Sequence, residues 1–222
     1  MPAAVLWDMD GTIIDSEPYW MDAETALVES FGGVWTHEDA LSVVGQGLWH
    51  TARVMRSRGV TLTDDEIIQA LTERVMAQVR VHVPWRPGAR DLLDALKHAG
   101  VPTALVTMSL RSLAELVVEA IRDDGLGTPF EVIVSGDDVE HAKPHPEPYL
   151  RAAELLGVEI TDCVAIEDSE PGLASAVASG AVSIGVPHMV PLIASPTHLL
   201  WSSLDGRTVA DLAAALESEL AR

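Results

Sequence analysis

The fold is decided by the stretch Ala3-Ala4-Val5-Leu6-Trp7-Asp8-Met9-Asp10-Gly11-Thr12. Its first five residues are apolar without polar alternation, which is typical of a strand buried on both faces of a parallel sheet. Two acids and a glycine follow, at the carboxyl end of that strand, where open parallel sheets bind their ligands. The stretch therefore predicts a functional site at this edge of the sheet.

Further apolar runs extend the pattern along the chain. Helical segments separate these runs. One such segment begins at Pro87, which is expected as a first helical residue, and ends at Gly100, which is expected as a C-terminal cap. We therefore predict an α/β fold with a Rossmann-like parallel sheet core and helices on both faces. The other predicted strands are 102–106, 132–134, 163–166 and 181–186, and the other bracketed helices are 146–157 and 171–180.

A long insertion separates the first two predicted strands. It lasts roughly seventy residues, far more than a normal connection between such elements. Sequences beginning at Thr36 and Thr63 match the capping box that opens helices, and an apolar stripe follows the second. We predict a small helical cap domain over residues 16–83, inserted into an α/β core of residues 1–15 and 84–222.

The charge of the chain limits its partners. Its 222 residues include 34 acidic and 14 basic side chains, a formal net charge of −20. Such a surface repels nucleic acid and anionic membranes, so we expect neither as a partner. The single cysteine, Cys163, and the lack of a basic leader before the first strand indicate a cytoplasmic protein. A small cap and an acidic surface favour a monomer.

Asp8 and Asp10 have the spacing of a nucleophile and an acid/base. A carboxylate attacks phosphorus when the charge of the phosphate is neutralised, forming an aspartyl phosphate that water hydrolyses. Asp8 fits that role, and Asp10 fits the group that protonates the leaving alcohol and later activates water. The alternative is an Asx turn at a strand end. The placement of Gly11 and Thr12 directly after the two acids favours catalysis.

Polar groups follow the next two predicted strands. Thr107 and Met108 end the second with a hydroxyl and backbone N–H groups suited to phosphate oxygens, although Thr107 could equally cap a helix. Lys143 follows the third and is the only lysine after Lys97. It could balance the charge of the nucleophile and of the phosphoryl group, or be a solvated loop residue.

The fourth strand is followed by two adjacent acids, Glu167 and Asp168. Facing Asp8 across the carboxyl edge, they form an oxygen-rich site suited to Mg²⁺. The alternative is that they stabilise the N-terminus of the next helix.

Taken in order, with a helical insertion after the first, these four motifs resemble those of the haloacid dehalogenase-like superfamily of phosphotransferases. The resemblance spans nearly the whole chain. It implies Mg²⁺ held by the Asp8 side chain, the Asp10 backbone carbonyl and Asp168, with Glu167 as a further contributor. It also implies a cap that closes over the substrate and excludes water. The matching residues are Asp8 and Asp10 in the first motif, Thr107 in the second, Lys143 in the third, and Glu167 and Asp168 in the fourth.

Residues 8–18 look most like the sugar- and polyol-phosphate phosphatases of the β-phosphoglucomutase-like branch. This implies Mg²⁺-dependent hydrolysis of a small phosphorylated metabolite, a sugar or polyol phosphate. The mutases of this branch are the alternative, but they carry a histidine where this chain has Trp20 and an arginine in the cap loop aligned to residues 45–49. A second alternative is a phosphate-binding regulator without catalysis, against which the retention of Asp8 and Asp10 argues.

Cap residues are expected to set the specificity, and each of them could instead serve packing. The candidates are Glu17, Trp20, Gln46, Trp49, His50 and Arg53.

Overall fold

The structure is a computed structural model that describes residues 1–192 and 196–221. Within them, six parallel strands form one sheet in the order β3-β2-β1-β4-β5-β6. This is the strand order of a Rossmann sheet and confirms the predicted α/β core. The strands are β1 (Ala4–Trp7), β2 (Thr103–Val106), β3 (Val132–Val134), β4 (Cys163–Glu167), β5 (Val182–Gly185) and β6 (Leu199–Leu200).

Alternate residues of each strand pack into two separate layers of core, because successive side chains of a strand point to opposite faces. The helices of the core are α5 (Ala89–Ala99), α6 (Arg111–Ile121), α7 (Glu147–Leu156), α8 (Glu170–Ser179) and α9 (Val209–Leu220), with a π-helical turn at Arg122–Leu126 and a 3-10 turn at Ile160–Asp162. Val5 and Trp7 of β1 pack with α5, α6 and α9, whereas Ala4 and Leu6 pack with α7 and α8.

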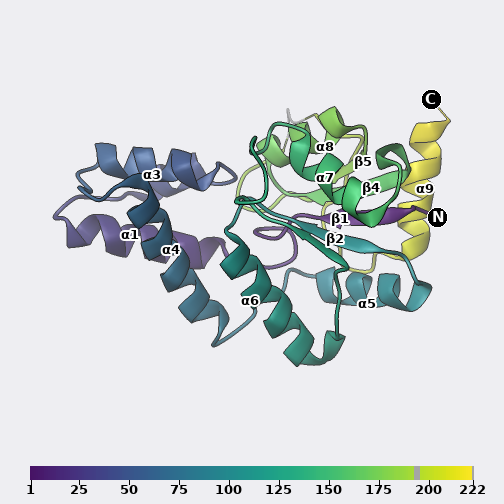
Figure 1. The fold of residues 1–222 in the computed structure, drawn as a ribbon, viewed down its shortest axis with the longest axis horizontal. Helices are drawn as coiled ribbons and strands as arrows, with labels where there is room; N and C mark the ends of the chain where they lie inside the picture. Colours follow the sequence, from purple (N-terminus) through teal and green to yellow (C-terminus); the bar gives the residue numbers. More distant parts are fainter. Residues whose placement is uncertain (193–195, 222) are drawn as a thin grey trace.

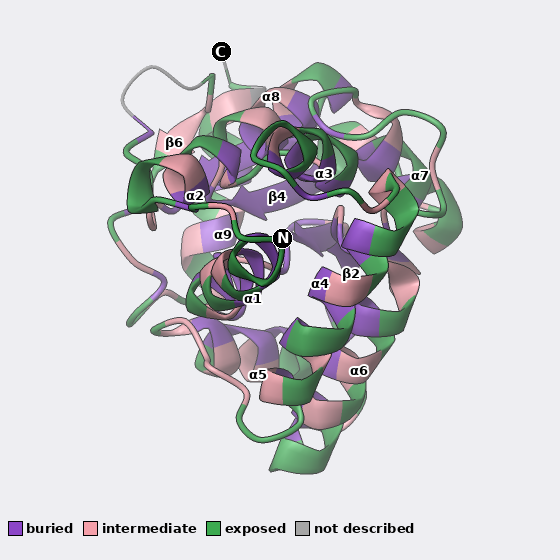
Figure 2. Ribbon diagram, turned by 90° about the vertical axis from the view of Figure 1, so that its left-hand side faces the viewer, coloured by how far each residue is buried: buried purple, intermediate pink, exposed green. Residues whose placement is uncertain are grey.

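The helical cap lies beyond the carboxyl ends of the strands (Figure 1). Figure 2 looks onto it and shows buried helix faces turned inward and exposed ones outward. Both predicted capping boxes are present, since Thr36 pairs with Asp39 and Thr63 with Glu66. The predicted apolar stripe of α4 is buried, which confirms that it is core packing. The cap helices are α1 (Glu17–Ser30), α2 (His37–Val43), α3 (Leu48–Ser57) and α4 (Asp64–Val79).

Two adjacent segments connect the cap to the core. The backbone N–H of Asp15 donates to Pro84 O over 2.6 Å, and that of Arg86 donates to Ile13 O over 2.9 Å. An antiparallel bridge joins Ile14 to Trp85 between them. The two crossings therefore lie side by side near residues 15 and 84, and the exact bounds of the cap stay a prediction.

Two local predictions were wrong, and one strand was missed. Pro87 is not helical: α5 begins at Ala89 after Gly88, which adopts a φ of +81° against the backbone of Leu204. The predicted loop 45–49 is shorter, because α3 begins at Leu48. Strand β6 was not predicted because its two residues give too little pattern.

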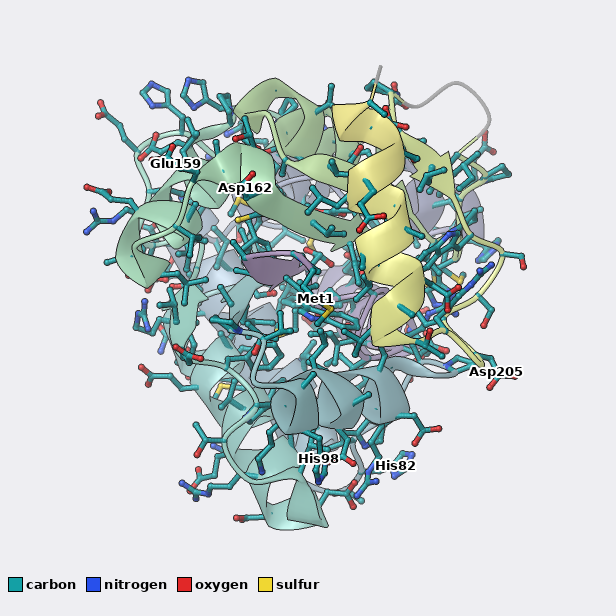
Figure 3. The ribbon with its side chains drawn as sticks, turned by 90° about the vertical axis from the view of Figure 1, so that its right-hand side faces the viewer. Met1, His82, His98, Glu159, Asp162 and Asp205 are labelled. Carbon is teal, nitrogen blue, oxygen red and sulfur yellow. The ribbon has the colours of Figure 1, made fainter. Side chains whose placement is uncertain are left out.

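Figure 3 shows the end of the molecule opposite the cap, where Met1 and Asp162 lie. The backbone N–H of Ala3 donates to Asp162 O here, fixing the amino ends of β1 and β4 together. The carboxyl ends of the strands consequently face the cap. In the described part of the chain, no helix combines the length and the apolar character needed to cross a membrane.

Candidate active site

Lys143 holds the carboxylate of Asp8 at the carboxyl end of β1. Its ammonium donates to Asp8 Oδ1 (2.7 Å), Glu167 Oε1 (2.6 Å) and the carbonyl of Val106 (2.8 Å). An ammonium has three N–H groups, so all are used. Burial opposes the charge on Lys143, but Asp8 and Glu167 outweigh it and raise the pKa of the ammonium. In this arrangement Lys143 orients the carboxylate of Asp8 and has no N–H left for a phosphate oxygen.

Glu167 is fully buried and bound on both oxygens. Besides Lys143, Oε1 accepts from the hydroxyl of Tyr149 at 2.8 Å. The other oxygen accepts from the backbone N–H of Asp168 and from the hydroxyl of Ser169. A Cβ at Gly172 would overlap this carboxylate, so α8 approaches it only because residue 172 is glycine. Glu167 therefore works as a support for Lys143 in this geometry.

Asp168 lies on the other side of the strand end, against the loop that carries Asp8. Its Oδ1 accepts from the hydroxyl of Thr12 over 3.2 Å. Gly11 has a φ of +81°, and a Cβ there would overlap the Asp168 carboxylate. A residue with a side chain at position 11 would thus be strained and would displace Asp168.

Asp8, Glu167 and Asp168 form an acidic cluster in which carboxylate oxygens lie within 4.8 Å of one another. Burial and the neighbouring Glu167 raise the pKa of Asp8 to about 8, and burial with Asp8 raises that of Asp168 well above its usual range. Lys143 pairs with two of these three carboxyl groups, so the cluster has unbalanced negative charge when all three are ionised. Hard oxygen donors with an excess of negative charge fit a divalent cation. The cluster could therefore hold one.

Asp10 receives donors from both the core and the cap. Oδ1 accepts from Ser16 Oγ (2.6 Å) and from the indole N–H of Trp20 (3.0 Å). Oδ2 accepts from Ser109 Oγ (2.7 Å) and Thr107 Oγ1 (3.3 Å). The predicted acid/base is thus fixed in position where the cap meets the sheet.

The loop after β2 carries the predicted phosphate-binding residues. The N–H of Thr107 is used by Val134 O, and its hydroxyl accepts from the N–H of Ser109. In residues 1–192 and 196–221, no acceptor is found for the N–H of Met108. This N–H is a backbone donor that is available to a phosphate.

A cavity of about 710 Å³, counting its open mouth, joins these groups to the cap. All the predicted core residues except Glu167 line it, as do Glu17, Trp20 and Gln46 of the cap candidates. The remaining candidates do not line it. Trp49, on α3, is 40% exposed and directs its indole N–H to Asp65, and His50 and Arg53 are exposed on the same helix. The structure therefore brings half of the cap candidates to the site.

Several residues of the site were not selected from the sequence. Ser109 lies in the loop after β2, beside the predicted residues Thr107 and Met108. Its hydroxyl, two residues after Thr107, is a feature of the sequence that could have identified it. Glu24 and Thr51 line the cap side of the cavity, and Tyr149 supports Glu167. Their spacing from the motifs gives no signal, because only the packing of α1, α3 and α7 brings them near.

Comparisons with known proteins agree with this geometry. Residues 2–180 match the model of the haloacid dehalogenase-like hydrolases. Protein CbbY of Rhodobacter capsulatus is 31% identical over 185 residues, covering 80% of this chain and 82% of that protein. Hexitol phosphatase B of Escherichia coli K12 is 30% identical over 191 residues, covering 83% of each.

A solved structure shows the same fold. It is that of a CbbY variant from Rhodobacter sphaeroides in complex with xylulose-(1,5)bisphosphate, with a TM-score of 0.82 and 28% identity, covering 96% of this chain and 99% of that one. The family match spans both the first motif, with Asp8 and Asp10, and the fourth, with Asp168. The chain belongs to the haloacid dehalogenase-like hydrolases.

Proposed function

We propose that this protein is a Mg²⁺-dependent phosphatase that hydrolyses a small phosphorylated metabolite, a sugar or polyol phosphate, through an aspartyl phosphate on Asp8. The observation that carries the proposal is the position of Asp8. Its carboxylate is buried at the carboxyl end of β1, opens on the cavity and is fixed by Lys143 at 2.7 Å. A fixed carboxylate is ready for attack without further reorganisation.

In the first half of the reaction, a carboxylate oxygen of Asp8 forms a bond to phosphorus and the bond from phosphorus to the substrate's ester oxygen breaks. Asp10, in its protonated form, gives its proton to that leaving oxygen. The alcohol then departs. Ser16, Trp20, Thr107 and Ser109 keep the carboxyl group of Asp10 in place for this transfer.

In the second half, the Asp10 carboxylate takes a proton from a water molecule. The oxygen of that water bonds to phosphorus, the bond to Asp8 breaks, and inorganic phosphate leaves with Asp8 free again. A phosphoryl oxygen is held by the N–H of Met108, which lines the cavity beside Asp8, while the hydroxyls of Thr107 and Ser109 donate to Asp10.

The residues that would hold the metal are Asp8, Asp168 and the backbone carbonyl of Asp10. Glu167 supports them from behind, because both of its oxygens already accept hydrogen bonds from the protein. A bound Mg²⁺ supplies positive charge that lowers the pKa of the carboxyls and draws charge from the phosphoryl oxygens. This offsets the raised pKa of Asp8 that burial produces without a cation.

The side chain at position 20 supports transfer of the phosphoryl group from Asp8 to water, and not back to a sugar. An indole N–H donates but cannot accept a proton, so Trp20 cannot take the part of a cap histidine. The names of the relatives support the substrate class, since one is a hexitol phosphatase and another was solved with a sugar bisphosphate.

The proposal is tested by phosphate release from p-nitrophenyl phosphate. We expect release that requires Mg²⁺, stops on chelation with EDTA, and falls more than about 1000-fold in Asp8→Asn. Asp22→Asn is the matched control, because Asp22 is an exposed carboxylate of α1 outside the cavity. Mass spectrometry after rapid acid quench should find a phosphoryl group on the peptide that contains Asp8. Full activity in Asp8→Asn, or release unaffected by EDTA, would contradict the proposal.

A further inference from the structure

Two buried carboxyl groups of the cap line the cavity without taking part in the proposed reaction. Glu17 and Glu24, on α1, are 7% and 5% exposed. They lie seven residues apart, so they share one face of the helix about two turns apart, on the order of 10 Å along its axis. Glu17 is the nearer to the reacting groups, since it lies between Ser16 and Trp20, which both donate to Asp10.

These carboxyl groups have unused hydrogen-bonding capacity. Glu24 Oε2 accepts from the indole N–H of Trp35 at 3.1 Å. Among the described residues, no donor reaches Glu24 Oε1 or either oxygen of Glu17. Because both carboxyl groups line the cavity, these free acceptor positions favour a ligand that brings hydroxyl groups.

The rest of the cap wall gives no support to a second anion. Apart from Glu17, Glu24 and Trp20, the cap lining is apolar except for the hydroxyl of Thr51 and the amide of Gln46, and among the described residues Lys143 is the only cation that lines the cavity. All three N–H groups of Lys143 are used within the core. A second phosphate or a carboxylate on the substrate would enter beside acids with no compensating charge. The remaining cap residues that line the cavity are Met21, Ala40, Val43, Val44, Gly45 and Leu48.

We propose that Glu17 and Glu24 are hydroxyl-binding residues that select monophosphates of uncharged five- or six-carbon sugars or polyols. Glu17 binds a hydroxyl near the ester oxygen, and Glu24 binds one at the far end of the carbon chain. A three-carbon alcohol reaches Glu17 alone, whereas an extended six-carbon chain reaches both. This inference rests on the proposed phosphatase function and sets its substrate class.

The experiment compares kcat/KM for mannitol 1-phosphate, glycerol 3-phosphate and fructose 1,6-bisphosphate. We expect the wild-type protein to prefer the hexitol monophosphate to both others. Glu24→Ala should lower the ratio of hexitol to glycerol phosphate activity about 10- to 100-fold, the effect of one hydrogen bond to a carboxylate. Glu24→Gln keeps an acceptor for Trp35 and for a hydroxyl, so it should lose less. Glu29→Gln, at an exposed acid of the same helix, is the control.

The outcomes separate the two proposals. If the wild type prefers the bisphosphate, or if Glu24→Ala lowers activity on both monophosphates equally, the hydroxyl-binding assignment is wrong while the phosphatase remains. If no monophosphate is hydrolysed by the wild type, the phosphatase proposal and the assignment both fail. Thermal unfolding of each variant distinguishes a loss of activity caused by misfolding from a loss of hydroxyl binding. If Glu24→Ala is misfolded, the activity ratio of Glu24→Gln tests the assignment.

Discussion

The indole N–H of Trp20, on the first cap helix, donates to Asp10 Oδ1 across 3.0 Å and so links the cap to an acid of the core. Position 20 therefore has a function besides packing, although the side chain is 8% exposed. Its N–H is one of four donors to the same carboxylate, two from each side of the cavity. Seating of the cap thus positions the proposed acid/base.

Replacing Trp20 by Phe keeps an aromatic ring and removes this donor. We expect kcat for p-nitrophenyl phosphate to fall about 3- to 10-fold, because one hydrogen bond contributes about 1 kcal/mol. Trp49→Phe is the matched control, since the indole of Trp49 bonds to Asp65 at 3.4 Å outside the cavity. An equal loss in both variants would show that the effect is not specific to Asp10.

Gly11→Ala should inactivate the enzyme through Asp168. The alanine Cβ would overlap the Asp168 carboxylate, at a position with a φ of +81°. Gly32 has a similar φ of +77° with no atom near its missing Cβ, so Gly32→Ala carries the backbone strain alone. We expect Gly11→Ala to lose more than about 100-fold in kcat/KM, as for a displaced catalytic group. Gly32→Ala should keep activity and lose about 1 to 2 kcal/mol of stability.

The sequence predicted the sheet and the acids at its edge because both have local signals. Apolar strands without alternation are visible in a single chain, and parallel strands place their carboxyl ends at one edge. Asp8, Asp10 and Asp168 were therefore found at the site without knowledge of packing. Thr36 and Thr63 likewise predicted the starts of two cap helices, because each is followed three residues later by the acid of a capping box.

The sequence could not show that the side chains of Glu167 and Asp168 point in different directions and contact different partners. Adjacent acids look alike in a sequence, but neighbouring side chains of a strand point to opposite faces. Glu167, the last residue of β4, points to Lys143 and Tyr149, whereas Asp168, the first residue after the strand, points to Thr12. The cap residues could not be assigned from the sequence for a similar reason. The way in which α1 and α3 pack against the rest of the protein decides which of their residues face the cavity. Glu24 lines it and Trp49 does not.

Tyr149→Phe tests the support behind Lys143. The hydroxyl donates to the buried Glu167 at 2.8 Å, and its removal leaves that oxygen with Lys143 alone. We expect a loss of about 1 to 2 kcal/mol in the free energy of unfolding, measured by urea titration. The control is Tyr19→Phe, whose hydroxyl reaches His82 O at 3.4 Å on the surface and which should change stability by less than about 0.5 kcal/mol. Similar losses would contradict a supporting role for Tyr149.

Glu24 gives a pH dependence of known sign. Burial raises its pKa from 4.5 to about 7, even though the hydrogen bond from Trp35 opposes the shift. The folded protein thus holds this proton more tightly than the unfolded chain. The contribution of Glu24 to the free energy of unfolding therefore falls as the pH rises from 4.5 to about 7, and it is constant above that.

Glu24→Gln removes this titration, so the variant should become more stable than the wild type as the pH rises. The difference should grow through the window from 4.5 to about 7 and reach up to about 3 kcal/mol. Urea unfolding at half-unit steps of pH measures it, with Glu29→Gln as the control on the exposed face of the same helix. Parallel stability curves for Glu24→Gln and the wild type would mean that Glu24 is ionised as readily in the folded protein as in water. Its burial against the apolar cap wall would then have to be relieved by solvent that reaches the carboxylate.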